Sequence, residues 1–140
     1  MRACALAIAG LIAASTAMAQ NAPAITCEVA DFTMTMRLYL PLVSGGSGSP
    51  GEAGMQGTLE IHHQKVPKER RFWSLDGKRP AQFWNQEGQL KMLLLLGLGE
   101  DAISILIDTA QRQGDGEYTG AFRLVAPGVK LTGKLACVVG

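Results

Sequence analysis

The chain has 140 residues, of which 17 are glycine, three are cysteine and 18% are charged. Arg2 is the only charged residue among the first 19, so the 12 basic residues beyond it balance the 12 acidic ones. This length fits one domain with one modest core. The neutral balance removes the overall attraction to phosphates on which nucleic-acid binding depends, and the apolar content excludes a disordered chain. We therefore expect no nucleic-acid partner.

The N-terminal 19 residues have the features of a secretory signal peptide in the usual order. Arg2 is followed by an almost wholly apolar stretch, residues 3–12, and later by Ala17-Met18-Ala19, a small-x-small cleavage site. A retained membrane anchor is the alternative, but the apolar stretch is short for spanning a bilayer. We predict cleavage after Ala19 and export to the periplasm or the medium. The mature chain, residues 20–140, is expected to be a single β-domain with no transmembrane segment.

Two cysteines, Cys27 and Cys137, remain in the predicted mature domain. In an exported chain such a pair most simply forms one disulfide. The bond would close a loop of about 110 residues. Because a disulfide requires closely spaced Cα atoms, we expect the first and last strands to be neighbours.

Alternation of apolar and polar residues predicts strands along most of the mature domain. The clearest run covers residues 30–42, where the even positions are apolar. Shorter alternating runs lie at 58–62, 89–96, 102–108, 118–124 and 129–139. Leu93 and Leu95 add apolar residues to the second face of the run 89–96, which predicts a strand covered on both sides. No segment has a sustained helical period, so we predict an all-β domain.

Short glycine-containing segments separate these runs and have the composition of hairpin turns. They are Asp76-Gly77, Glu87-Gly88, Gly97-Leu98-Gly99, Gly114-Asp115-Gly116 and Pro127-Gly128. Strands joined in this way form an antiparallel meander, and a disulfide between its ends would curl the sheet. We predict seven or eight strands in a small closed or nearly closed barrel, with a two-layer β-sandwich as the alternative.

Two segments do not follow the simple alternation. Residues 43–57 are rich in glycine and serine and predict a flexible loop, either a tolerated insertion or a lid over one end of the barrel. Cys27 has the parity of the polar side of the run 30–42. Either a bulge lies near residues 28–30, or Cys27 precedes the strand.

The sequence contains none of the common catalytic motifs, such as G-x-S-x-G, H-E-x-x-H or C-x-x-C. His62 and His63 are adjacent, so in a strand they point to opposite faces and cannot chelate together. His62 shares a face with Glu60, but a specific metal site needs a third or fourth ligand. Acid–base chemistry with Asp76 or Asp108 would require the fold to bring them to a histidine. We expect no metal, no other cofactor and no enzymatic activity.

Aromatic and basic residues concentrate between residues 65 and 84. Two segments, beginning at Phe72-Trp73 and Phe83-Trp84, share the pattern Phe-Trp-x-x-acidic-Gly. In a strand, one ring of each pair faces the core and the other faces outward. Residues 65–79 contain six basic and two acidic residues, whereas residues 100–117 contain five acidic and one basic. The candidate binding surface comprises Lys65, Lys68, Arg70, Arg71, Trp73, Lys78, Arg79 and Trp84.

These features favour a non-enzymatic interaction protein of the cell envelope that uses surface aromatics and a basic cluster. Its partner would be an envelope protein, a polymer or a lipid-like ligand. Charged strand edges that only maintain solubility are the simpler explanation of the basic cluster. The alternative function is a small barrel that binds an apolar or amphipathic ligand in its interior or mouth, lined by adaptable methionines such as Met34, Met36 and Met92. Large residues expected inside, such as Phe32 and Phe122, favour a filled barrel instead.

Overall fold

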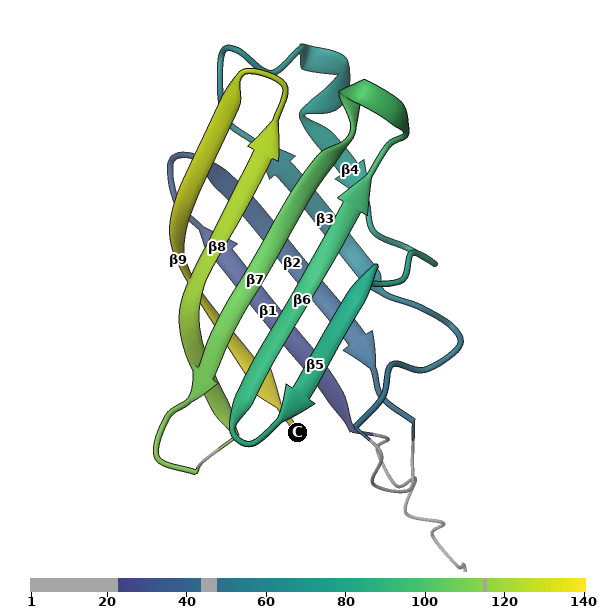
Figure 1. Cartoon of the computed structure of the whole chain (residues 1–140), viewed down its shortest axis with the longest axis vertical. Helices are drawn as coiled ribbons and strands as arrows, with labels where there is room; N and C mark the ends of the chain where they lie inside the picture. The colour runs from purple at the N-terminus through teal and green to yellow at the C-terminus, as the bar shows by residue number, and fades with distance from the viewer. Residues whose placement is uncertain (1–22, 44–47, 115) are drawn as a thin grey trace, which may run out of the picture.

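The computed structural model describes residues 23–43, 48–114 and 116–140, so the predicted signal peptide lies outside the described residues. Nine antiparallel strands form one curled sheet in this part of the chain (Figure 1). The elements are β1 (Ala24–Ala30), β2 (Met34–Pro41), β3 (Gln56–Ile61), η1 (Lys68–Arg70), β4 (Phe72–Ser74), β5 (Gln82–Gln86), β6 (Gln89–Leu96), η2 (Gly99–Asp101), β7 (Ile103–Gln111), β8 (Glu117–Ala126) and β9 (Val129–Val139). The all-β prediction is confirmed, with more strands than the seven or eight expected.

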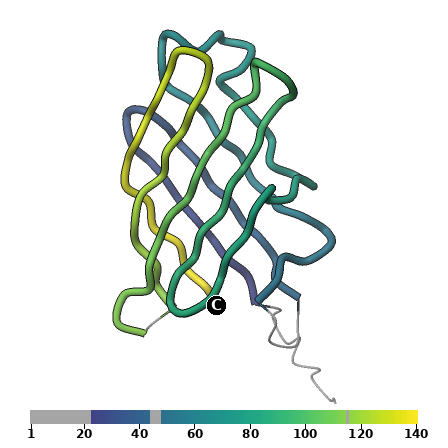
Figure 2. Tube along the Cα trace, in the orientation of Figure 1, coloured from purple at the N-terminus to yellow at the C-terminus, as the bar shows by residue number. Residues whose placement is uncertain are grey.

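The order of strands in the sheet is β4-β3-β2-β1-β9-β8-β7-β6-β5. Every pair is formed by consecutive strands except β1 and β9, which join the two ends of the sequence. The sheet curls so that β1–β3 cross behind β6–β9 (Figure 2). The predicted meander, with its first and last strands adjacent, is therefore confirmed as a nearly closed barrel whose edge strands are β4 and β5.

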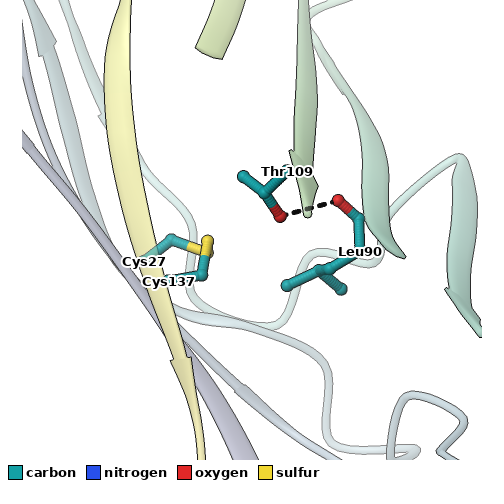
Figure 3. Close-up of a disulfide and its surroundings, with 4 residues drawn as sticks. All are labelled: Cys27, Leu90, Thr109 and Cys137. Atoms are coloured by element: carbon teal, nitrogen blue, oxygen red, sulfur yellow. Dashed lines mark hydrogen bonds between the residues drawn. A yellow bond between two sulfur atoms is a disulfide. The ribbon is translucent and has the colours of Figure 1, made fainter. Parts of the chain in front are cut away.

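The predicted disulfide lies at the junction of β1 and β9. Cys27 is directly opposite Cys137, their Cα atoms are 4.1 Å apart, and both side chains are fully buried. Figure 3 shows the bond inside the barrel, together with the buried hydroxyl of Thr109, which donates a hydrogen bond to the carbonyl of Leu90 at 2.8 Å. The disulfide therefore belongs to the core, and the Thr109 hydroxyl near it has a hydrogen-bond partner.

The predicted continuous strand over residues 30–42 is wrong, because the chain turns between β1 and β2. One carboxylate oxygen of Asp31 accepts hydrogen bonds from the backbone N–H groups of Thr33 and Met34 and from the Thr33 hydroxyl, at 2.8, 2.9 and 2.7 Å. Such side-chain-to-backbone bonds are typical of tight turns.

This turn explains the parity of Cys27 and corrects the position of Phe32. Inward residues are odd-numbered in β1 and even-numbered in β2, because the turn shifts the alternation. Cys27 therefore faces the core without a bulge. Phe32, which was expected inside, lies in the turn and is 90% exposed.

The barrel interior is filled by apolar side chains, as the size of the predicted inward residues indicated. Those confirmed as buried are Met34, Met36, Leu38, Leu90, Leu94, Ile105, Phe122 and Leu124. They form one cluster with the remaining core, against which Trp73 and Phe83 are packed. Close packing of this kind supplies most of the stability of a small domain.

The edge strands β4 and β5 do not pair, so the predicted hairpin at Asp76-Gly77 is wrong. The Gly77 N–H instead donates to the carbonyl of Met55, and the Met55 N–H donates to the carbonyl of Lys78. This segment therefore continues toward the β3 side of the barrel. We call the opening between β4 and β5 the seam.

The seam is bridged above and below by contacts other than strand pairing. We define the upper end of the barrel as the end with the turns 31–33, 97–102 and 127–128 and the loop 62–71. There Arg70 and Asp101 form an ion pair at 2.8 Å across the seam. At the lower end, the loop between β2 and β3 reaches β5, because a Cβ atom on Gly48 would lie 3.2 Å from the side-chain amide of Asn85. The described residues 48–55 of the predicted glycine-rich loop then return to β3, with Met55 buried.

Candidate functional site

The fold divides the predicted binding surface among several places. Lys65, Lys68, Arg70 and Arg71 lie in or beside the upper loop 62–71, and Lys78 and Arg79 lie in the segment between β4 and β5. Trp73 in β4 points toward the core, whereas Trp84 in β5 points outward. The eight residues thus lie in the upper loop, on β4, between β4 and β5, and on β5.

Several of these side chains hold the protein's own loops. The Arg71 guanidinium donates to the carbonyls of Val66 and Gln64, at 2.8 and 3.3 Å. The Arg79 guanidinium donates to the carbonyl of Glu52. The indole N–H of Trp73 donates to the carbonyl of Arg70 at 2.7 Å. These contacts give the residues structural roles.

The ion pair between Arg70 and Asp101 joins the basic stretch of the sequence to the acidic one. The hydrogen bond from Arg70 holds the pKa of Asp101 below its ordinary value, and the Asp101 carboxylate raises the pKa of Arg70 in return. Both side chains are partly exposed to water, which screens the pair. This ion pair thus neutralises part of the predicted difference in charge between residues 65–79 and residues 100–117.

The two Phe-Trp segments have opposite orientations. In β4, Phe72 is 60% exposed and Trp73 packs against the core, whereas in β5 Phe83 packs against the core and Trp84 is 47% exposed. The prediction that one ring of each pair faces inward is confirmed. The sequence similarity of the two segments therefore does not correspond to a structural repeat.

A patch of apolar side chains covers the outer side of β5, β6 and β7. It consists of Trp84, Leu93, Leu95 and Leu106, which we call the outer patch. Leu93 lies opposite Leu106 in the β6–β7 pair, Leu95 is 54% exposed and Leu106 is 38% exposed. The prediction that this part of β6 is covered on both sides is wrong for the part of the chain that the structure describes. Exposed patches of this kind are common at interaction sites.

The outer patch contains a shallow hollow of about 430 Å³. Its lining residues are Gln82, Phe83, Trp84, Gln89, Lys91, Met92, Leu93 and Leu106. Lys91 is 3.8 Å from Asp108, so a neighbouring carboxylate offsets its charge. A second hollow of about 140 Å³ also includes Leu106 and extends to Arg123 and Thr132. The surface of the larger hollow is thus largely apolar, with the side-chain amides of Gln82 and Gln89 at its edge.

A strip of basic residues lies beside the outer patch on β8 and β9. It consists of Arg123, Lys130 and Lys134, all exposed and on the outer side of the sheet, and we call it the basic strip. Arg123 lies opposite Leu106 in the β7–β8 pair, so the strip adjoins the patch. The sequence from 118 to 138 contains no acidic residue. The outer face therefore combines an apolar area with a positively charged border.

Our sequence prediction included Trp84 and put Leu93 and Leu95 on the second face of their strand, but it took that face to be covered and did not identify the strip. The signal was present, because Leu93, Leu95 and Leu106 have the opposite parity to their buried neighbours. Parity places a side chain on the second face of a sheet but does not reveal whether another element covers that face. The basic strip was missed because its residues are spread over two strands and form no local run of charge.

His62 lies beside Glu60, with which the sequence placed it on one face, and also beside Thr35. Its Nε2 atom is 2.9 Å from the Thr35 hydroxyl, and its Nδ1 atom is 4.0 Å from the Glu60 carboxylate. Asp76 instead accepts a hydrogen bond from the backbone of Gly57. Thr35, Glu60 and His62 lie on the solvent-exposed side of β2 and β3. Within the described ranges, no group of three or more His, Cys, Asp or Glu side chains could hold a metal ion.

No protein-family model, curated protein or solved structure matches the chain. Among the residues that the structure describes, no helix is long and apolar enough to cross a membrane.

Proposed function

We propose that the protein is an exported, non-enzymatic interaction protein that binds another protein through the outer patch and the basic strip. The observation that carries this proposal is the hollow beside Trp84, which is lined by Leu93 and by the exposed Leu106. The buried disulfide supports export, because such bonds persist in oxidising compartments.

The composition of the outer face favours a protein partner. Interfaces between proteins typically have an apolar centre with an aromatic anchor and a polar rim. Trp84 supplies the aromatic ring, Leu93 and Leu106 supply the centre, and Gln82 and Gln89 supply amide groups at the rim. Because the Lys91 charge is offset by Asp108, the centre can be covered without burying an isolated charge.

The basic strip indicates the chemistry of the partner. Its three cations outnumber the one acidic side chain that shares a hollow with Arg123, which is Asp108 and which is also paired with Lys91. The strip therefore attracts a negatively charged surface. We therefore propose a partner that inserts an apolar side chain beside Trp84 and places acidic residues along Arg123, Lys130 and Lys134. Compared with the sequence-based proposal, Trp84 keeps its role, whereas the basic contribution moves from the upper loop to β8 and β9.

The alternative function, ligand binding inside the barrel, has less support. Of the methionines expected to line a pocket, Met34 and Met36 are at most 2% exposed and belong to the packed core. Met92 is among the lining residues of the hollow but is itself only 1% exposed. The 430 Å³ hollow lies on the outer face.

Site-specific photo-crosslinking tests the proposal in the producing cell. A benzophenone amino acid at Leu95 samples the outer patch, and the same amino acid at Tyr39 is the matched control, because Tyr39 is also exposed but lies on β2. We expect one defined protein adduct from position 95 that is absent from position 39. Leu106→Asp should abolish this adduct, while the far-UV circular dichroism and the disulfide are retained.

The captured protein is then purified and its affinity measured by calorimetry. Leu106→Asp should weaken binding by about tenfold or more, since it places a charge in an apolar contact. Lys134→Glu should mainly slow association and reduce its dependence on salt. An adduct that forms equally at both positions, or a purified partner whose affinity is unchanged by Leu106→Asp, would refute the proposal.

A further inference from the structure

Two turns at the upper end of the barrel carry large apolar side chains. Phe32 lies between β1 and β2 and is 90% exposed, and Leu98 lies between β6 and η2 and is 94% exposed. Turn positions usually hold Gly, Pro, Asn, Asp or Ser, because these residues suit the turn backbone and water. At such exposure neither side chain adds appreciably to the core, so the fold itself does not explain them.

A third apolar side chain lies at the upper end of the seam. Phe72 begins β4, points outward and is 60% exposed. The adjacent Trp73 ring lies against the backbone of Gly97, where a Cβ atom would be 3.4 Å from it. Phe72 and Leu98 are therefore the sequence neighbours of two residues that touch across the seam. The Arg70–Asp101 ion pair also crosses the seam at this end.

The charged groups at this end balance, because its four basic side chains are matched by Asp31, Glu69, Glu100 and Asp101. Lys65 and Lys68 are exposed in the upper loop, while Arg70 and Asp101 neutralise each other. The Asp31 carboxylate is engaged in hydrogen bonds within its turn. The remaining acidic side chains of this end are Glu69 and Glu100, and the remaining basic one is Arg71, which holds the loop carbonyls.

We propose that the upper end docks on the surface of a lipid bilayer, with Phe32, Phe72 and Leu98 inserted among the headgroups. Separate convex tips suit a deformable lipid interface, whereas a protein partner is better matched by a continuous surface such as the outer patch. Because the charges of this end balance, the apolar side chains supply the attraction, and Lys65 and Lys68 offset the repulsion between the acidic side chains and the anionic phosphates. This inference rests on residues other than those of the proposed function.

Vesicle flotation of the disulfide-bonded protein tests this docking. The vesicles contain phosphatidylcholine alone or phosphatidylcholine mixed with phosphatidylglycerol. We expect the protein to float with both, and to a similar extent. The double variant Phe32→Ser/Leu98→Ser should reduce partitioning by about tenfold or more, since two apolar side chains no longer leave water. Phe72→Ser should give a smaller reduction.

The matched control removes apolar area from the lower end of the barrel. Val43 and Val138 are 43% and 55% exposed, so Val43→Ser/Val138→Ser should leave flotation unchanged. Lys65→Gln/Lys68→Gln should weaken binding to the mixed vesicles alone, and less so at high salt. Leu106→Asp, which tests the outer patch, should not affect flotation.

Three outcomes would overturn the inference. The first is a wild-type protein that floats with neither vesicle. The second is a Phe32→Ser/Leu98→Ser variant that floats like wild type. The third is an equal loss in the Val43→Ser/Val138→Ser control, which would show nonspecific adsorption. Thermal melts of every variant distinguish loss of docking from loss of folding.

Discussion

Cys27 and Cys137 lie opposite each other on β1 and β9, so their disulfide fastens the strand pair that joins the two ends of the sequence. Every other pair in the sheet is formed by consecutive strands and can be held by a local connection. The β1–β9 pair also aligns only four residue pairs, against ten between β8 and β9. The covalent bond thus lies where closure of the barrel has the highest entropic cost.

Replacement of both cysteines by alanine should lower the free energy of unfolding by about 4–5 kcal/mol, because the unfolded chain is no longer constrained by a loop of about 110 residues. Guanidinium denaturation followed by fluorescence measures the change. The wild-type protein with its disulfide reduced should unfold at a similar denaturant concentration. An unchanged midpoint in both would show that strand pairing alone holds the ends together.

Trp73 and Trp84 should respond differently to truncation. Trp73→Ala removes a ring packed against the core and its 2.7 Å hydrogen bond to the Arg70 carbonyl, so we expect a loss of about 2–4 kcal/mol in unfolding free energy. Trp84→Ala removes an outward ring and should change stability by less than about 1 kcal/mol. Chemical denaturation of both single variants provides the comparison. Equal destabilisation would mean that Trp84 is also part of the core.

The alternation of the sequence was sufficient to predict strands, a meander and adjacent ends, but not the turn at residues 31–33. Asp31, Phe32 and Thr33 continue the apolar–polar alternation, so the pattern contains no break. The turn is instead specified by hydrogen bonds of one carboxylate, which hydropathy does not register. The seam was missed for a related reason. Asp76-Gly77 has turn composition, but its hydrogen-bond partner, Met55, is distant in the sequence.

Site prediction was limited by tertiary contacts. The basic residues around Arg70 and Arg71 formed a visible cluster, yet the fold uses both guanidinium groups in internal contacts. Conversely, Leu95 and Leu106 had no distinctive motif, and their importance depends on the absence of a covering element within the described residues. Charge runs and strand parity are local properties, whereas an exposed face is a property of the assembled sheet.

The turn at Asp31 should make stability depend on acid pH. Burial raises the pKa of Asp31, but the hydrogen bonds from Thr33 and Met34 outweigh it and hold the pKa below its ordinary value of 3.8. Because the folded state favours the ionised form, this contribution is present above the unfolded pKa. It is lost as the pH falls through the folded pKa. Asp31→Asn keeps an oxygen acceptor but removes the charge.

We therefore expect wild type to be more stable than Asp31→Asn at neutral pH, by about 1–2 kcal/mol. The difference should shrink below about pH 4, as the carboxylate of the unfolded chain and then that of the folded protein become protonated. Urea denaturation at a series of pH values measures both stabilities. A difference that is independent of pH would mean that the charge of Asp31 makes no contribution and that only its geometry matters.

Gly57 should tolerate no side chain, because the backbone of β3 approaches that of β2 closely at this point. Its φ angle is 131°, and a Cβ atom would collide with the carbonyl oxygen of Arg37. Its own carbonyl accepts a hydrogen bond from Leu75, so a shift would disturb two neighbouring segments. Gly57→Ala should cost about 2 kcal/mol or more, whereas Thr58→Ala, at the next and exposed position, should cost less than about 0.5–1 kcal/mol. Denaturation midpoints of the two variants test this contrast, and equal values would show that β2 and β3 can separate to accommodate the methyl group.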